Sequence, residues 1–236
     1  MPESAQKVAI ITGAGRGIGR ATAEAFAKQG FACVLVARNR DELAETQSLC
    51  GSDAVAEPAD VRDGPLASAI VARVAGRLGR VDVLVNNAGL APLVPFGEMT
   101  DQIFRDTIDT NLLAAYHYAR AVWPIMAKQK GGAIVTLSSE SARDPFDGFA
   151  AYAAAKAGVN AFTKALASEG DALGIRCVAI APAGVETGML RQIAPAEQLP
   201  PANVLTPEDV AEAIVAAAIG PLRYASGEVI YLHKRA

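Results

Sequence analysis

A tyrosine and a lysine one helical turn apart are the residues of this sequence best suited to act together in chemistry. Tyr152 and Lys156 lie in an alanine-rich stretch without proline, which predicts a helix over residues 151–173. Their spacing places both side chains on one face of that helix. A neighbouring ammonium favours the phenolate and lowers the pKa of a phenol, so Tyr152 is expected to exchange a proton at neutral pH. The alternative is a chance pair on a solvated helix face.

A glycine-rich loop after the first predicted strand indicates a ligand for the site. Residues 13–19 read Gly-Ala-Gly-Arg-Gly-Ile-Gly, between an apolar strand at 7–12 and a helix at 17–29. Glycines let the backbone approach a pyrophosphate closely, and the helix N-terminus offers free N–H groups. The G-x-x-x-G-x-G spacing is not the commonest one, but its position favours a dinucleotide site over a turn needed only for packing.

The end of the second predicted strand, residues 32–37, indicates which dinucleotide binds. NAD-binding proteins usually carry an acid there, which accepts a hydrogen bond from the ribose 2′-hydroxyl. Here the strand ends at Ala37 and is followed by Arg38, while Arg16 lies in the glycine loop on the same side. Two converging guanidinium groups suit a 2′-phosphate, so we expect NADP(H) rather than NAD(H). The alternative is that both arginines are solvated surface residues.

The elements that must position these residues alternate along the whole chain. Short apolar runs predict strands at 7–12, 32–37, 54–57 (the weakest), 82–85, 133–137, 175–180 and 228–232. Helical patterns lie between them at 17–29, 40–49, 63–78, 101–128, 151–173 and 207–219. Apolar strands separated by helices are typical of a parallel sheet covered on both faces. Without repeats or a long linker, the sequence predicts a single doubly wound α/β domain over residues 1–236.

Composition excludes several classes of function. Hydrophobic residues make up 51% of the 236 residues and charged ones 20%, so a large core can form. A net charge of −3 favours neither nucleic acid nor an anionic membrane as partner. The polar start is no signal peptide, and no apolar run is long enough to span a bilayer. Cys33, Cys50 and Cys177 form no metal-binding or disulfide pattern, so we expect no metal and a cytoplasmic protein.

In this order and spacing, the motifs resemble those of the short-chain dehydrogenase/reductase family, in particular NADP(H)-dependent 3-oxoacyl reductase-like members. The shared motifs are Thr12-Gly13-x-x-x-Gly17-Ile18-Gly19, Asp60-Val61, Asn86-Asn87-Ala88-Gly89, Asn111, Ser138-Ser139, Tyr152-x-x-x-Lys156 and Pro182-x-x-Val185-x-Thr187. The resemblance implies a Rossmann-like sheet with strand order 3-2-1-4-5-6-7. It also implies hydride transfer between C4 of a nicotinamide and a carbonyl or secondary alcohol substrate.

The resemblance also implies roles for four catalytic residues. Tyr152 would be the general acid/base, and Lys156 would bind the nicotinamide ribose and lower the pKa of Tyr152. Ser139 would hold the substrate carbonyl oxygen. Asn111 would kink the long helix at 101–128 and hold a water that leads protons to Lys156. The cofactor-binding residues implied in the same way are Gly13, Arg16, Gly17, Ile18, Gly19, Arg38, Asp60, Val61, Asn87, Tyr152, Lys156, Val185 and Thr187.

The sequence departs from the family pattern in two places. Ala183 stands between Pro182 and Gly184, where the family usually has Pro-Gly, and the usual Asp-Gly-Gly ending is replaced by residues 232–236. Neither departure touches the four catalytic residues. The family implies a homodimer or homotetramer built through helices, and the altered ending leaves the geometry of that assembly open.

The segment that would cover the substrate, after Thr187, is short and indicates an open pocket. The candidate lining residues are Leu90, Pro92, Leu93, Glu140, Ser141, Arg143, Phe146, Phe149, Met189 and Leu190. This mostly apolar set leaves the substrate open, with a 3-oxoacyl thioester or small ketone as the first expectation. Arg143 would contact an anionic substrate or be a solvated loop charge. His117 and His233 lack partners at metal-ligand spacing and are not expected to be catalytic.

Two other classes of function remain open at this stage. One is a non-catalytic dinucleotide-binding redox sensor on the same fold. A sensor would have no chemical need of Ser139, Tyr152 and Lys156, which favours the enzyme. The other is a lyase-type or epimerising relative. The intact glycine loop disfavours relatives that work without the nucleotide.

Overall fold

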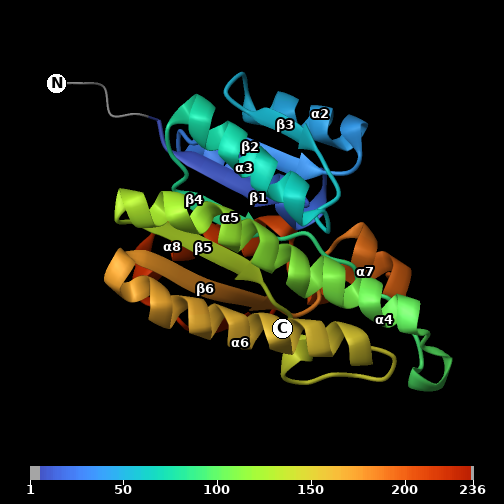
Figure 1. Cartoon of the computed structure of the whole chain (residues 1–236). Coiled ribbons are helices and arrows are strands. Elements are labelled where there is room, and N and C mark those ends of the chain that lie inside the picture. Colours follow the sequence, from blue (N-terminus) through green and yellow to red (C-terminus); the bar gives the residue numbers. More distant parts are fainter. Residues whose placement is uncertain (1–5, 235–236) are drawn as a thin grey trace.

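The sheet of this protein is parallel throughout and has the strand order that the family resemblance implies. The computed structural model describes residues 6–234, and seven strands form one sheet in the order β3-β2-β1-β4-β5-β6-β7 (Figure 1). The expected single domain is therefore observed as one sheet with its helices. The first five residues of the polar start and the last two of the unusual ending lie outside the described residues.

The strands match the apolar runs to within a few residues. Their bounds are β1 Val8–Thr12, β2 Ala32–Ala37, β3 Val55–Pro58, β4 Val83–Asn86, β5 Gly132–Leu137, β6 Ile175–Pro182 and β7 Val229–Leu232. β1 and β2 are almost completely buried, as expected for strands covered on both faces. β6 runs two residues further than predicted because Ala181 and Pro182 pair with Tyr231 and Leu232 of β7.

Helices cover both faces of the sheet. Their bounds are α1 Gly17–Lys28, α2 Arg40–Cys50, α3 Gly64–Leu78, α4 Asp101–Ile108, α5 Ala114–Gln129, α6 Ala150–Gly170, α7 Gly188–Ile193 and α8 Pro207–Ala218. Buried side chains of α1, α2 and α8 form one core layer against the sheet. Those of α3, α5 and α6 form the other layer, which faces the viewer in Figure 1. The loops at the carboxyl ends of the strands are thereby held on a rigid scaffold.

The single helix predicted at 101–128 is interrupted, which corrects its boundaries. α4 and α5 are joined by a π-helical turn over Asp109–Leu113. The side chain of Asn111 accounts for this π turn. Its Nδ2 donates to Thr107 O within the helix (2.9 Å) and to Leu90 O outside the helix (2.8 Å). A side chain that bonds into the helical ladder opens it locally. The interruption expected at Asn111 is thus a π turn that points its side chain inward.

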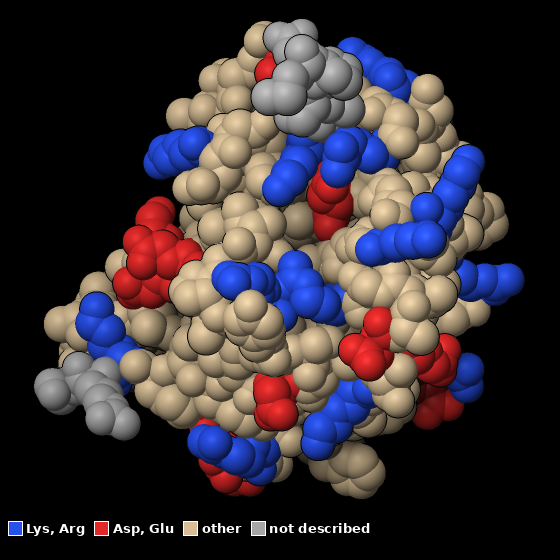
Figure 2. Space-filling model, turned by 90° about the vertical axis from the view of Figure 1, so that its left-hand side faces the viewer, with Lys and Arg blue, Asp and Glu red and all other residues tan. Residues whose placement is uncertain are grey.

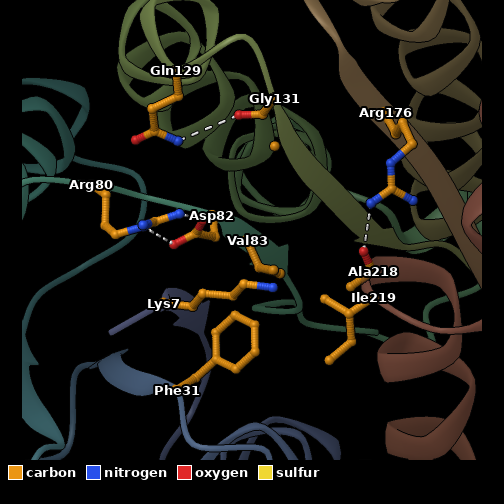
Figure 3. Close-up of a pocket in the computed structure, with 11 residues that line it drawn as sticks. Lys7, Phe31, Arg80, Asp82, Val83, Gln129, Gly131, Arg176, Ala218 and Ile219 are labelled. Carbon is orange, nitrogen blue, oxygen red and sulfur yellow. Dashed lines mark hydrogen bonds and ion pairs between the residues drawn. The ribbon is translucent and has the colours of Figure 1, made fainter. Parts of the chain in front are cut away.

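The amino-terminal edge of the sheet is closed by polar contacts between strand ends and helix ends. Asp82 accepts hydrogen bonds from Val8 N (2.8 Å) and from the Arg80 guanidinium (2.6 Å and 2.8 Å), around a cavity of about 230 Å³ (Figure 3). Arg176 donates to Ala218 O (2.7 Å) and so satisfies the C-terminus of α8. Figure 2 shows Lys and Arg side chains interspersed with Asp and Glu on the face turned to the viewer.

Candidate active site

A large hollow lies at the carboxyl ends of the strands. It has a volume of about 1270 Å³ and is lined by the loops that follow β1, β2, β3, β4, β5 and β6. This is the place where open parallel sheets bind ligands. The predicted site residues that line it are Gly13, Arg16, Gly17, Ile18, Arg38, Asp60, Val61, Asn87, Asn111, Ser139, Tyr152, Lys156, Val185 and Thr187.

The glycine loop is shaped by contacts that exclude larger side chains. Gly13 has a φ of +66°, and a Cβ placed on it would lie 2.7 Å from Asn87 Nδ2 and 2.9 Å from Ala88 Cα. Asn87 Nδ2 in turn donates to Thr12 O and Gly13 O, which fixes the loop on β1. Gly19 does not line the hollow. A Cβ there would lie 2.1 Å from Gly13 O, so Gly19 permits α1 to pack against the loop.

Tyr152 and Lys156 lie on the same face of α6, as the spacing predicts. The Lys156 Nζ is 5.6 Å from the centre of the Tyr152 ring. Lys156 is almost fully buried, and its Nζ donates a 2.6 Å hydrogen bond to Leu137 O at the end of β5. Tyr152 is half-buried and lines the hollow. The lysine is therefore anchored to the sheet beneath the phenol.

Burial sets the protonation of this pair and corrects one expectation. Desolvation raises the pKa of Tyr152, and a hydrogen bond with the Ser139 side chain offsets part of that rise. Burial also lowers the pKa of Lys156 to about 8. The expected lowering of the Tyr152 pKa by Lys156 is absent in the protein alone, because the buried site disfavours both charged forms.

Ser139 is held by a second serine that the sequence indicated only as a lining residue. The Ser141 N–H (3.2 Å) and the Ser141 Oγ (3.0 Å) both lie within hydrogen-bond distance of Ser139 Oγ. With Ser141 donating both bonds, the two lone pairs of the Ser139 hydroxyl are used, and its proton is directed outward. Ser139 can then donate to an oxygen in the hollow, which is the role expected of it.

Asn111 contributes an unsatisfied acceptor beside the lysine. Its Oδ1 is buried and has no hydrogen-bond partner among the described residues. A Cβ placed on Gly89 would lie 2.7 Å from this oxygen and 3.8 Å from Lys156 Nζ, so both atoms border the same space. A polar group there would satisfy the amide oxygen, consistent with the water expected between Asn111 and Lys156.

Charged residues at the opposite end of the hollow form a network that sequence spacing did not reveal. Arg62 donates to Asp60 (2.7 Å) and to Asp106 on α4 (3.0 Å). The Arg62 hydrogen bond is the main cause that lowers the pKa of Asp60. Arg16 does not stand free beside Arg38, because it forms an ion pair with Glu42 of α2. Asp60 and Arg62 are two positions apart, but Arg16 and Glu42 are separated by 26 positions and Arg62 and Asp106 by 44, so only the fold brings those two pairs together.

The substrate end of the hollow is mainly apolar, as predicted. Leu90, Glu140, Ser141, Phe146, Phe149, Met189 and Leu190 line it, whereas Pro92, Leu93 and Arg143 do not. Arg143 pairs with Glu140 and Asp144 and stands 4.2 Å from the centre of the Tyr231 ring. These contacts favour the interpretation of Arg143 as a loop charge over that of a contact to an anionic substrate. The covering helix α7 has six residues and is capped by Thr187, whose Oγ accepts from Leu190 N.

The two histidines lie outside the lining of the hollow. The His117 ring packs against Gly64, where an added Cβ would lie only 2.7 Å from the ring. His233 Nδ1 lies 3.0 Å from Glu140 Oε2, a contact that the sequence did not indicate. Within residues 6–234, no group of three or more His, Cys, Asp or Glu side chains could hold a metal ion. No helix of that range is long and apolar enough to cross a membrane.

Comparison with known proteins places the chain in a family. The family model for short chain dehydrogenases matches residues 7–198. The 3-oxoacyl-[acyl-carrier-protein] reductase FabG of Escherichia coli is 31% identical over 233 residues, covering 96% of each chain. The oxidoreductase UcpA of Salmonella typhimurium is 40% identical over 193 residues, covering 80% of this chain and 73% of the relative.

A solved structure agrees with this result. A Sinorhizobium meliloti protein described as a short-chain alcohol dehydrogenase superposes with a TM-score of 0.89 at 33% identity, covering 95% of this chain and 94% of the other. The fold and the site thus define an oxidoreductase of the kind that uses a nicotinamide dinucleotide. The chain belongs to the short-chain dehydrogenase family.

Proposed function

We propose that this protein is an NADP(H)-dependent carbonyl reductase or alcohol dehydrogenase. The observation that carries the proposal is the meeting of Ser139, Tyr152 and Lys156 in one hollow, at the carboxyl edge of the sheet and beside the glycine loop. A proton donor, an oxygen-binding hydroxyl and a buried ammonium are the groups that reduction of a carbonyl needs.

The lining fits a dinucleotide. Gly13, Gly17 and Ile18 line the hollow beside the N-terminus of α1, whose free N–H groups suit a pyrophosphate. Arg16 and Arg38 would hold a 2′-phosphate, Asp60 and Val61 would flank the adenine, and Asn87 would lie along the path between the two halves of the cofactor. Val185 and Thr187 would hold the carboxamide. Bound in this way, the cofactor supplies or accepts the hydride at the substrate carbon.

The chain's own residues handle the proton. In the direction of reduction, Ser139 donates a hydrogen bond to the carbonyl oxygen and stabilises the charge that develops there. Tyr152 then gives its phenolic proton to that oxygen, leaving a phenolate beside Lys156. Lys156, anchored to Leu137 O, stabilises the phenolate, and the space beside Asn111 Oδ1 provides a route for a proton to return.

The apolar substrate end and the relatives favour a carbonyl compound with an apolar chain. Phe146, Met189 and Leu190 line that end, and the helix that would cover it, α7, has only six residues. FabG of Escherichia coli, a relative matched over 96% of this chain, is by name a 3-oxoacyl reductase. A 3-oxoacyl thioester or a small ketone is therefore the substrate class we propose.

A non-catalytic redox sensor is the competing function, and one substitution separates it from the enzyme. The protein is assayed by NADPH oxidation against ketones and 3-oxoacyl esters, as wild type and as Tyr152→Phe. We expect the substitution to reduce kcat by about 10²- to 10⁴-fold, because the general acid is lost while the ring remains. Tyr224→Phe, at a tyrosine that is 82% exposed and outside the hollow, is the matched control. Unchanged activity in Tyr152→Phe would refute the role of the phenol.

A further inference from the structure

Glu42, in the first turn of α2, reaches the end of the hollow where the adenosine ribose would lie. Its backbone N–H is bound by the Asn39 side chain (3.2 Å), which caps α2 and fixes the start of the helix. A Cβ placed on Gly15 would lie 2.9 Å from Glu42 Oε2 and 3.0 Å from its Cβ. The glutamate side chain therefore lies directly against the glycine loop.

The carboxylate borders the position where an acid is missing from β2. The same Cβ on Gly15 would lie 3.6 Å from the side chain of Ala37, the last residue of β2. NAD-binding sheets carry their acid at this strand end. Ala37, Arg38 and Glu42 all line the hollow, so the carboxylate of α2 enters the space that a strand-end acid would occupy.

The charges around Glu42 leave it available to a ligand. Its ion pair with Arg16 is 3.4 Å long, and the Arg16 side chain is 72% exposed, whereas that of Glu42 is 29% exposed. Exposed ion pairs of this kind contribute little to stability. Arg16 can therefore move away from Glu42 while the carboxylate keeps its position. The other two acids at this end, Asp60 and Asp106, are both bound by Arg62.

We propose that Glu42 sets the discrimination between a ribose 2′-hydroxyl and a 2′-phosphate, by supplying from α2 the acid that β2 lacks. The inference rests on the proposed binding of a dinucleotide in this hollow. A 2′-hydroxyl can donate a hydrogen bond to the carboxylate, whereas a 2′-phosphate is repelled by it and must draw Arg16 away. The preference for NADP(H) that Arg16 and Arg38 create is therefore reduced by Glu42, and NAD(H) is also accepted.

The test measures binding of two fragments that differ only in the 2′-phosphate, adenosine 2′,5′-bisphosphate and 5′-AMP, by calorimetry on the intact protein. In Glu42→Gln, we expect the ratio of their affinities to shift toward the bisphosphate by about tenfold, because a like charge near the phosphate is removed. The shift should shrink in high salt. Glu42→Asp keeps the charge and should stay closer to the wild-type ratio.

Glu45→Gln is the matched control. Glu45 lies on the same helix, pairs with Arg20 at 2.7 Å and does not line the hollow, so its neutralisation should leave the ratio unchanged. An unchanged ratio in Glu42→Gln, or an equal shift in Glu45→Gln, would overturn the inference while the cofactor site stands. Binding of neither fragment to the wild type would instead overturn the proposed site itself, and the inference with it.

Discussion

At the level of single residues, burial governs the pKa values of Tyr152 and Lys156 as much as the proximity of the two side chains does. Lys156 is 4% exposed, and its ammonium is disfavoured enough to lower its pKa to about 8. Tyr152 is affected in the opposite direction, since burial disfavours its phenolate. In the proposed reaction, charge on the substrate and cofactor would therefore have to help select the state with a phenolate and an ammonium.

The burial of Lys156 leads to a prediction about the free energy of unfolding. Its pKa of about 8 in the folded protein lies below the ordinary value of 10.5, so the unfolded chain binds more protons between these pH values. The free energy of unfolding should thus rise with pH across that window, as far as Lys156 contributes. Below about pH 8, the cost of burying the charge is fully present. Lys156→Met, which removes that charge, should be more stable than wild type at pH 7 by about 1 to 3 kcal/mol.

The measurement is urea unfolding of both proteins from pH 7 to pH 10. The advantage of Lys156→Met should decline as pH rises above about 8, because wild-type Lys156 then loses its proton in the folded state. An advantage independent of pH would contradict this explanation. The variant should also lose the proposed reductase activity, as expected where a side chain needed for function lowers the stability of the fold.

At the level of elements, helix ends and one helix defect position the site. The π turn at Asp109–Leu113 directs Asn111 inward, and Asn39 and Thr187 cap α2 and α7 beside the hollow. The sequence and its family resemblance predict that Asn111 interrupts the helix at 101–128. They do not predict that the interruption is a π turn. The π turn accompanies a hydrogen bond from Asn111 Nδ2 to Leu90 O, which lies outside the helix.

The start of α8 provides a test of capping away from the site. Thr206 Oγ accepts from Asp209 N (3.1 Å), and the Asp209 carboxylate accepts from Thr206 N (2.8 Å), which completes a capping box. Thr206→Ala should reduce the free energy of unfolding by about 1 kcal/mol, because an N–H of the first turn loses its partner. Thr206→Ser should retain most of the stability in the same urea unfolding experiment. Equal losses in both variants would argue against the cap.

At the level of the whole molecule, the described chain exposes apolar side chains on α4, the π turn and α5. Phe104, Leu113 and Tyr116 are 41%, 38% and 37% exposed, and Tyr116 meets Phe162 of α6 at 6.4 Å between ring centres. Large apolar patches that are exposed to solvent are typical of surfaces that bind another protein. The homodimer or homotetramer expected from the family would cover them.

Light scattering tests this assembly. We expect a mass of two or four times 24.4 kDa, and a shift toward the single-chain mass in Tyr116→Glu, because a charge would be buried in the contact. Tyr224→Glu, at a far more exposed tyrosine outside these helices, should leave the mass unchanged. A wild-type mass of 24.4 kDa would contradict the prediction.

The sequence by itself determined the parallel sheet, the glycine loop and the Tyr152–Lys156 face, because these depend on local periodicity and on short fixed spacings. It also placed Ser139 and Asn111 near the site through the family resemblance. Only the tertiary structure decided which charges meet there. The contacts of Glu42 with Arg16 and of Arg62 with Asp106 join positions that are distant in the sequence. Burial, which sets the pKa values of Tyr152 and Lys156, likewise exists only once the whole chain is packed.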